Sequence, residues 1–353
     1  MKRFGHMLSL LLFLALFPPA DRVWALDKKL IRVFVASRPQ QLQLAGENFD
    51  FATAVFPDHA DIVADRRDEE RLAAMGFRYS VLPDEYPGLR KPARQGALYY
   101  RSYDEMVQTL QACRQNYPAI TRLFELGQSV QGRTIYGLKV SDHPDSEEID
   151  EPGVLYVGNI HAREVITPEI IFYFLEHLLN GYGHDDRITR LIQERQLWMI
   201  PSLNPDGHVR VEAGDRWWRK NCRINADGSI GVDLNRNFSY RWGYDFIGSS
   251  PVPADETYRG PAAFSEPETQ IIRDFVRRHR VDASLFYHSY GNLWLFPWSY
   301  GYVNTPHHPV FLEMGRAMAQ ANGYTPGNSS MGVIYLVNGD SDDYLYEIGR
   351  AHV

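Results

Sequence analysis

Short apolar segments that alternate with helix-start patterns constrain the fold of this chain more than any other feature. The segments Val154–Val157, Leu197–Ile200 and Leu285–His288 have the length of strands and are rich in apolar residues. From residue 102 onward, helix-start patterns lie between and around them. Strands that alternate with helices predict an α/β fold, in which a mixed, largely parallel central sheet is flanked by helices.

Three of the helix starts are marked by capping residues. Ser102 and Glu105 form a capping-box pattern, and Ser265 and Glu268 form another. Thr167 is placed to cap a third helix, which has a proline at its first turn and an Asn-Gly pair at its end. We therefore expect hydroxyl caps at all three positions.

Residues 1–25 have the layout of a secretory signal peptide. Lys2 and Arg3 precede an apolar run over residues 7–17, and Val23 and Ala25 occupy the positions that signal peptidase reads. The run is well short of the roughly 20 apolar residues that cross a bilayer, so a transmembrane anchor is the less favoured alternative. No later segment is long and apolar enough to span a membrane. A secreted or periplasmic protein, with no membrane contact after cleavage, is expected.

Residues 26–95 predict a small, separate α/β region. Strand patterns at Leu30–Val35 and Phe77–Leu82 flank a helix pattern at about residues 68–74. A stretch rich in Pro, Gly, Arg and Lys around residues 83–96 then leads to one larger domain, residues 96–353, of about 250 residues. The small region could be removed as a prodomain or kept as an accessory domain.

Charge and cysteine content narrow the class of protein further. The chain carries 44 acidic and 37 basic residues and no long block of Lys and Arg, so nucleic acid is not an expected partner. Its two cysteines, Cys113 and Cys222, cannot build a disulfide framework in an oxidising compartment. Cys113 shares helical spacing with Met106 and Leu110, which favours a buried, unreactive thiol over a bridge or a nucleophile.

Metal-ligating side chains follow two of the predicted strands. His161 and Glu164 stand three residues apart after the first strand, although this pair alone is more typical of a surface histidine beside a solvated glutamate. His288 favours a metal site, because it also lies at the C-terminal end of a strand, where open α/β sheets hold their ligands. Two imidazoles and one carboxylate give Zn²⁺ three ligands and leave a position for water. We expect one zinc ion per chain, in preference to other divalent ions.

Several ordered motifs between Tyr99 and Tyr346 resemble those of the zinc metallocarboxypeptidases, the family of digestive carboxypeptidases A and B and bacterial carboxypeptidase T. The motifs are Gly132–Ile135, Gly158–Glu164, Asn204–Gly207, Trp218–Asn221, Gly231–Asn237 and His288–Tyr290. The resemblance implies that His161, Glu164 and His288 bind zinc. It also implies that Asp233 holds the ring of His161, with a loop-capping aspartate as an equal alternative.

The resemblance also implies how a peptide is bound. Arg219 would polarise the scissile carbonyl and stabilise the oxyanion, in preference to being an ordinary surface arginine. Asn235 and Arg236 match the pair that binds the terminal carboxylate, a group that a planar guanidinium reads well. Arg163 matches a further substrate-binding arginine, and Tyr335 matches the mobile tyrosine that closes over the substrate. A capping asparagine and a solvated arginine are the alternatives.

Two acidic residues near the end of the chain bear on specificity. By the same resemblance, Asp342 lies at the base of the pocket for the departing side chain, and Asp340 lies where carboxypeptidase T-like members also carry an aspartate. An acidic pocket favours a cation, which predicts a preference for C-terminal Lys or Arg. The acidic run could instead be a solvated turn.

The chain departs from the family at its C-terminal end. The general-base glutamate is expected a short way beyond Val353, so no residue here is assigned that role, and loss of a base lowers a rate by about 10²–10⁴-fold. The residues Glu347–Val353 resemble a translated sequencing adapter, which favours the interpretation that the real protein continues.

These features predict a secreted, monomeric, zinc-dependent metallocarboxypeptidase that hydrolyses the C-terminal peptide bond of peptides and proteins. Two other functions stay open. A pseudopeptidase would bind peptide C-termini without hydrolysis, and a zinc deacylase of the same fold would act on acylated amino acids.

Overall fold

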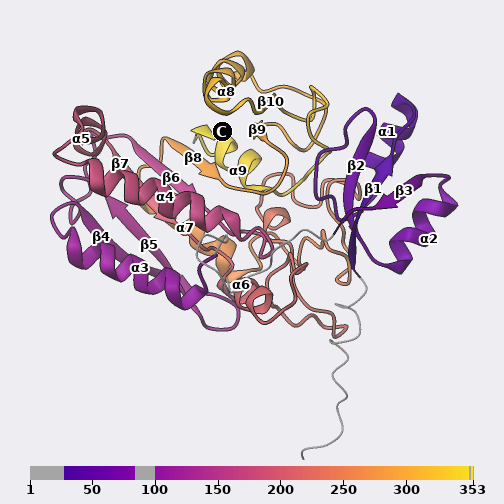
Figure 1. Cartoon of the computed structure of the whole chain (residues 1–353), viewed down its shortest axis with the longest axis horizontal. Coiled ribbons are helices and arrows are strands. Elements are labelled where there is room, and N and C mark those ends of the chain that lie inside the picture. The colour runs from indigo at the N-terminus through magenta and orange to yellow at the C-terminus, as the bar shows by residue number, and fades with distance from the viewer. Residues whose placement is uncertain (1–27, 84–99, 350, 353) are drawn as a thin grey trace, which may run out of the picture.

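The computed structural model describes residues 28–83, 100–349 and 351–352, so the expected signal peptide and most of the connecting stretch lie outside the described residues. Residues 28–83 form an N-terminal unit, drawn in indigo in Figure 1, to one side of the remaining chain. Its elements are β1 (Lys29–Phe34), α1 (Arg38–Ala45), β2 (His59–Ala64), α2 (Arg66–Ala74) and β3 (Arg78–Val81). β1 lies between β2 and β3 and pairs with both in antiparallel register. The predicted strands and helix of this region are confirmed, and α1 and β2 were not predicted.

The larger part of the chain is built on one six-stranded sheet. Its strands are β4 (Thr121–Gln128), β5 (Thr134–Val140), β6 (Gly153–Val157), β7 (Gln196–Ile200), β8 (Ala283–Phe286) and β11 (Ala351–His352). Their order across the sheet is β11-β8-β6-β7-β5-β4. The first four of these run parallel, and β5 and β4 are antiparallel to their neighbours. The predicted mixed, largely parallel sheet is confirmed.

Helices cover both faces of the sheet (Figure 1). One face packs against α3 (Tyr103–Asn116), α4 (Ile166–Gly181) and α5 (Asp186–Gln193). The other packs against α7 (Pro267–Arg278) and α9 (Ser341–Glu347). Along β6, Leu155 and Val157 face the second cluster while Val154 and Tyr156 contact the first. This period of two is the reason that a four-residue apolar segment can be buried on both sides.

The remaining elements are short or peripheral. They are α6 (Pro205–Glu212), the 3₁₀ helix η2 (Leu234–Arg236), β9 (Leu293–Leu295), α8 (His308–Asn322) and β10 (Thr325–Gly327). Cys113 lies on the buried face of α3, and Cys222 is also buried; both are free cysteines. Within the described ranges, no helix has the length and apolar character that a membrane span requires.

Only one of the three predicted hydroxyl caps forms. Ser102 accepts a hydrogen bond from Glu105 N, and the Glu105 carboxylate accepts one from Ser102 N, so this capping box is confirmed. The Ser265 prediction is wrong: α7 starts one residue later than such a cap would require, and its cap residue Glu266 makes no side-chain capping hydrogen bond. The carboxylate of Glu268 instead accepts from Val130 N at 3.0 Å, in a distant loop.

The Thr167 prediction is also wrong, because Thr167 lies inside the first turn of α4. Its hydroxyl donates to the carbonyl of Glu164 at 2.8 Å and accepts from the backbone N–H of Asn159 at 2.8 Å. The hydroxyl therefore ties the start of α4 to the loop after β6, which carries the metal-ligand motif. β8 ends at Phe286, two residues before His288, so both candidate ligand segments leave the sheet at the same edge.

Candidate metal centre and active site

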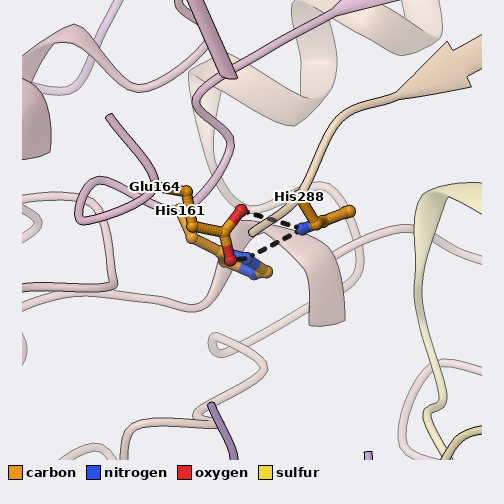
Figure 2. Close-up of side chains that lie close together, drawn as sticks. All are labelled: His161, Glu164 and His288. Atoms are coloured by element: carbon orange, nitrogen blue, oxygen red, sulfur yellow. Dashed lines mark hydrogen bonds and ion pairs between the residues drawn. The ribbon is translucent and has the colours of Figure 1, made fainter. Parts of the chain in front are cut away.

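Three side chains from two strand ends meet at one point (Figure 2). The Nδ1 atom of His161 lies 2.9 Å from Oε1 of Glu164, and the Nδ1 atom of His288 lies 3.1 Å from Oε2 of the same carboxylate. The two Nδ1 atoms are 3.1 Å apart. His161 and Glu164 are buried, whereas His288 remains partly open to solvent.

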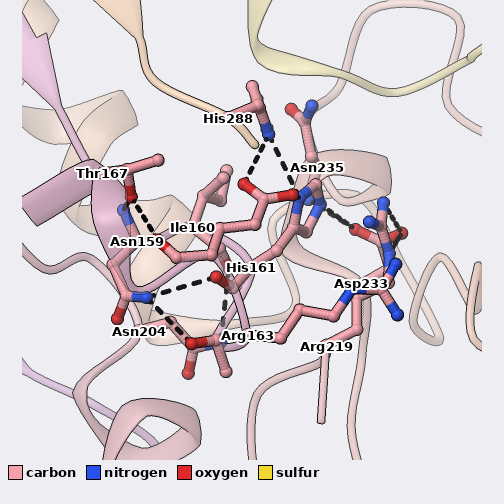
Figure 3. Close-up of polar contacts among 12 residues, drawn as sticks. Asn159, Ile160, His161, Arg163, Thr167, Asn204, Arg219, Asp233, Asn235 and His288 are labelled. Carbon is pink, nitrogen blue, oxygen red and sulfur yellow. Dashed lines mark hydrogen bonds and ion pairs between the residues drawn. The ribbon is translucent and has the colours of Figure 1, made fainter. Parts of the chain in front are cut away.

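Buried polar residues hold the loop that presents His161 and Glu164 (Figure 3). Asn159 has a positive φ of 51°, a conformation that asparagine tolerates better than most residues. Its side-chain amide donates to the carbonyls of His161 and Ala162 at 3.2 and 3.1 Å. The side-chain amide of Asn204 donates to the carbonyl of Ile160 at 3.2 Å. The direction of the ligand side chains thus depends on hydrogen bonds from residues that bind no metal themselves.

The surroundings of the three ligand side chains shift the pKa of each one and keep the carboxylate ionised. Burial would raise the pKa of Glu164, but the two imidazoles outweigh it and hold that pKa well below its usual range. Burial and the charge of Arg219 lower the pKa of His161, which favours its neutral, ligating form. Burial would also lower the pKa of His288, but the charge and hydrogen bond of Glu164 outweigh burial and raise that pKa. A carboxylate therefore stays ionised between two imidazoles.

This donor set fits zinc. Two imidazole nitrogens that face each other at 3.1 Å can share at most one proton, whereas a single cation would satisfy both lone pairs and the carboxylate. Atoms bound tetrahedrally at about 2.0–2.2 Å from one zinc ion lie roughly 3.4 Å apart. The observed separations of 2.9–3.1 Å need only a small outward shift to reach that geometry. Three protein ligands leave the fourth position open, as in catalytic zinc sites.

Asp233 connects the metal ligands to two arginines. Its Oδ1 atom lies 3.2 Å from Nε2 of His161, on the side of the ring away from the metal point. Its Oδ2 atom accepts from Nε and Nη2 of Arg219 at 3.1 and 3.0 Å and lies 3.8 Å from Nη1 of Arg236. Oδ1 also caps η2 by accepting from Asn235 N. The two alternatives considered for this aspartate, ring partner and loop cap, therefore coexist in one side chain.

Arg219 is a buried residue and not a surface arginine. Its carbonyl accepts from Ala162 N at 3.0 Å, which places the segment that carries it alongside the ligand loop. Burial would lower its pKa, but the charge of Asp233 raises it, so the guanidinium stays charged. A fixed positive charge in a buried site is the type of group that stabilises a developing oxyanion.

Arg236 and Asn235 lie side by side on η2 and are both buried. Arg236 donates from Nη1 to the carbonyl of Asn235 at 2.8 Å. Its Nε atom is buried and meets no hydrogen-bond acceptor within the described part of the chain. A buried donor without an acceptor is costly, and an anionic ligand would satisfy it.

Arg163, expected to bind substrate, is paired with a residue of the N-terminal unit. Its guanidinium forms a two-pronged ion pair with Asp50 of the N-terminal unit, with N–O distances of 2.5 and 2.7 Å. Both side chains are more than nine-tenths buried. Asp50 of the N-terminal unit is thus paired with Arg163, one of the residues expected to bind substrate.

Two tyrosines near the site also contact the N-terminal unit. The ring of Tyr335 stacks on Phe51 with centroids 4.9 Å apart. The hydroxyl of Tyr290 donates to Asp61 at 3.0 Å, and Asp61 is itself paired with Arg32. Tyr335, expected to close over a substrate, is therefore packed against residues 28–83 in this structure.

The acidic residues expected at the specificity pocket lie at the start of α9. Asp340 is buried and caps the helix by accepting from Asp343 N, so it is not part of a solvated turn. Burial and the neighbouring charge of Asp342 raise the pKa of Asp340 to about 7. Asp342 is partly exposed and close enough to His288 to contribute to its raised pKa.

Sequence reasoning missed several residues that shape this site. A Gly-Asn pair directly after a strand could have indicated the positive φ of Asn159, because asparagine is enriched at such positions. Nothing in the sequence pattern indicated that Asp50 and Asp61, far from the metal motif, would pair with Arg163 and Tyr290.

Comparison with known proteins points the same way as the geometry. Residues 106–352 match the family model described as zinc carboxypeptidase. The chain is 34% identical to human carboxypeptidase B over 252 residues, which is 68% of this chain and 58% of that protein. It is 30% identical to mouse mast cell carboxypeptidase A over 264 residues, which is 72% of this chain and 61% of that protein. The chain thus spans about three fifths of the length of these two curated relatives.

A solved structure agrees over a larger share of the chain. The crystal structure of a carboxypeptidase A from Helicoverpa armigera superposes with a TM-score of 0.79 at 28% sequence identity. The superposition covers 92% of this chain and 87% of that one. It therefore includes residues of the N-terminal unit as well as the larger domain.

Proposed function

Since the chain belongs to the zinc carboxypeptidase family, we propose that it is a secreted, zinc-dependent enzyme that hydrolyses the last peptide bond of peptides and proteins. The observation that carries the proposal is the meeting of His161, Glu164 and His288, joined through Asp233 to the buried guanidinium of Arg219. The signal-like layout of residues 1–25 supports secretion.

The residues of the chain have separate tasks in this proposal. His161, Glu164 and His288 hold the zinc ion, which when bound supplies a Lewis acid and a water of pKa near 7. Asp233 engages Nε2 of His161 and so leaves Nδ1 directed at the metal. Arg219 provides a charge that is already in place when the oxyanion develops.

Recognition of a chain end needs groups that read a free carboxylate. Arg236, with its buried and unpaired Nε, and the neighbouring amide of Asn235 are suited to bind it. Arg163 and Tyr335 would join the substrate site after the N-terminal unit has moved away. Asp340 and Asp342 favour a cationic side chain at the departing residue, so C-terminal Lys and Arg are the proposed preference.

Release of single amino acids tests the proposed function. The zinc-loaded protein is expected to liberate free Lys, Arg or Leu from the C-terminus of model peptides, at a rate lowered by about 10²–10⁴-fold because no residue of this chain is assigned as general base. A chelator should abolish this release until Zn²⁺ is added back. Liberated amino acids are measured by mass spectrometry. Peptide binding without release would indicate a pseudopeptidase, and hydrolysis of acylated amino acids but not of peptides would indicate a deacylase.

We also propose that the N-terminal unit acts as a prodomain that blocks the site. Its support is the pairing of Asp50 with Arg163 and of Asp61 with Tyr290, and the stacking of Phe51 on Tyr335. Each contact engages a residue close to the proposed substrate site. Removal of the unit would free all three at once.

Replacement of Asp50 by Asn is expected to activate the uncut chain. Loss of one partner of a buried ion pair costs about 3–5 kcal/mol, so the rate of amino acid release should rise by at least about tenfold. Initial rates on the uncut protein measure this. Asp58→Asn is the matched control, because Asp58 lies on the same unit and its side chain is 82% exposed. Equal rates for both variants would contradict the blocking role.

A further inference from the structure

The turn that precedes α9 is packed directly against the segment that carries Asn235 and Arg236. The backbone N–H of Phe238 donates to the carbonyl of Gly339 at 2.8 Å. Gly339 has a φ of +73°, and a Cβ atom there would lie 2.5 Å from the carbonyl oxygen of Arg236. The backbone N–H of Ser341 donates to Oδ1 of Asn235 at 3.0 Å. These three contacts hold the two segments in one arrangement.

The contact from Ser341 determines which end of the Asn235 amide is available. Oδ1 is engaged by Ser341 N–H, and the backbone N–H of Asn235 is engaged by Asp233. Nδ2 donates to no residue of the described chain. The amide therefore turns its acceptor inward and keeps its donor free, next to the unpaired Nε of Arg236.

We propose that the backbone N–H of Ser341 is a positioning group for recognition of the substrate's terminal carboxylate, acting through the Asn235 amide. The inference rests on the proposed function, since it assigns Asn235 to a carboxylate. With Nδ2 free, the pair of Asn235 and Arg236 offers only donors. A carboxylate accepts hydrogen bonds from both Asn235 and Arg236. An amidated chain end places its NH₂ group opposite one of these donors, so that this donor has no acceptor.

The location of Ser341 explains how its N–H can serve this purpose. Ser341 is the first residue of α9, and the N–H groups of a first helical turn have no acceptor within the helix. Asp340 caps the helix through Asp343 N, so it leaves Ser341 N–H to Asn235. Asp340 has a ψ of 170°, which is an extended conformation. A proline at position 341 would therefore be compatible with the backbone of Asp340.

The variant Ser341→Pro tests the positioning role. Proline at the first helical position preserves the helix start and removes the N–H, and its ring atom would displace Oδ1 of Asn235. Ser341→Ala is the matched control, because it keeps the N–H and removes only the hydroxyl contact with Asp342. The protein is the zinc-loaded full chain, cut by trypsin between the two units with both pieces kept in solution. The probes are L-arginine and L-leucine, each compared with its own C-terminal amide.

Dissociation constants from NMR titration are expected to separate the variants. Ser341→Pro should weaken binding of the free amino acids by about 10- to 100-fold and leave binding of the amides unchanged. Ser341→Ala should keep the wild-type ratio of free-acid to amide affinity for both amino acids, because its hydroxyl contacts Asp342 and not the Asn235 amide. In an Asn235→Ala background, Ser341→Pro should cause no further loss, because its effect passes through Asn235.

Three results would overturn the inference. They are unchanged binding of free amino acids by Ser341→Pro, an equal loss in Ser341→Ala, or an additional loss in the Asn235→Ala background. If Ser341→Pro does not fold, hydrogen exchange at Ser341 N–H decides: exchange should accelerate in Asn235→Ala, and unchanged exchange would refute the contact. A wild-type protein that binds neither free amino acid would instead overturn the proposed function itself.

Discussion

Replacing Glu164 by Gln is expected to eliminate zinc binding at micromolar concentrations of the metal, and hydrolysis with it. The substitution keeps the size of the side chain but removes the charge that lies 2.9 and 3.1 Å from the two imidazoles. Loss of a partner outside the ligand set typically costs 10- to 100-fold in metal affinity, so loss of a ligand should cost more than about 100-fold. Zinc content after dialysis and competition with a coloured chelator measure the change.

Glu176→Gln is the matched control for this experiment. Glu176 lies on α4, and its half-exposed side chain pairs with Arg101 away from the metal point. This variant should retain zinc and the rate of the parent protein. If Glu164→Gln kept the zinc affinity of the parent protein, the three-ligand centre described here would be wrong.

Replacing Arg219 by Ala is expected to lower kcat by about 10²–10³-fold while zinc remains bound. The guanidinium is buried and held by two hydrogen bonds to Asp233, so it is a charge in a fixed position. Asp233 keeps its contact with His161 in the variant, which should preserve the metal site at saturating zinc. Rates of arginine release and zinc content, measured on the same sample, test both parts.

Two further variants test whether the effect of Arg219→Ala is specific to the guanidinium at this position. Arg219→Lys retains a charge but not the planar fork, so it should recover only part of the rate. Arg216→Ala removes a nearby arginine that stacks over Trp217, and it should leave kcat unchanged. A parent-like kcat for Arg219→Ala, or loss of zinc together with the rate, would show that the arginine has a structural role instead.

The arrangement of the sheet was predictable because its signals are local. Each strand of the parallel core is a short apolar segment, and the capping box of Ser102 depends on residues three apart. The Ser265 and Thr167 predictions failed because they also used local signals only. The two hydroxyls and the nearby carboxylate of Glu268 have partners in distant loops. A local pattern cannot show that a tertiary contact competes for the same group.

In the candidate site, too, the local signals were predictable and the contacts between distant segments were not. The order and spacing of the motifs predicted that His161, Glu164 and His288 would come together, and the strand ends do bring them within hydrogen-bonding distance of one another. The shared use of Asp233 by His161, Arg219 and η2 was not predictable, because its three partners come from separate segments.

The metal-ligand motifs and the strands of the sheet were predictable from the sequence, because ligand identity and apolar periodicity are properties of neighbouring residues. The orientation of these groups depends on contacts between residues that are distant in the sequence. Asn159 bends the ligand loop, Ser341 orients the amide of Asn235, and Asp50 covers Arg163. Each of these effects depends on a buried polar group finding its partner across the fold, and the cost of leaving such a group unpaired is paid only once the chain has folded around it.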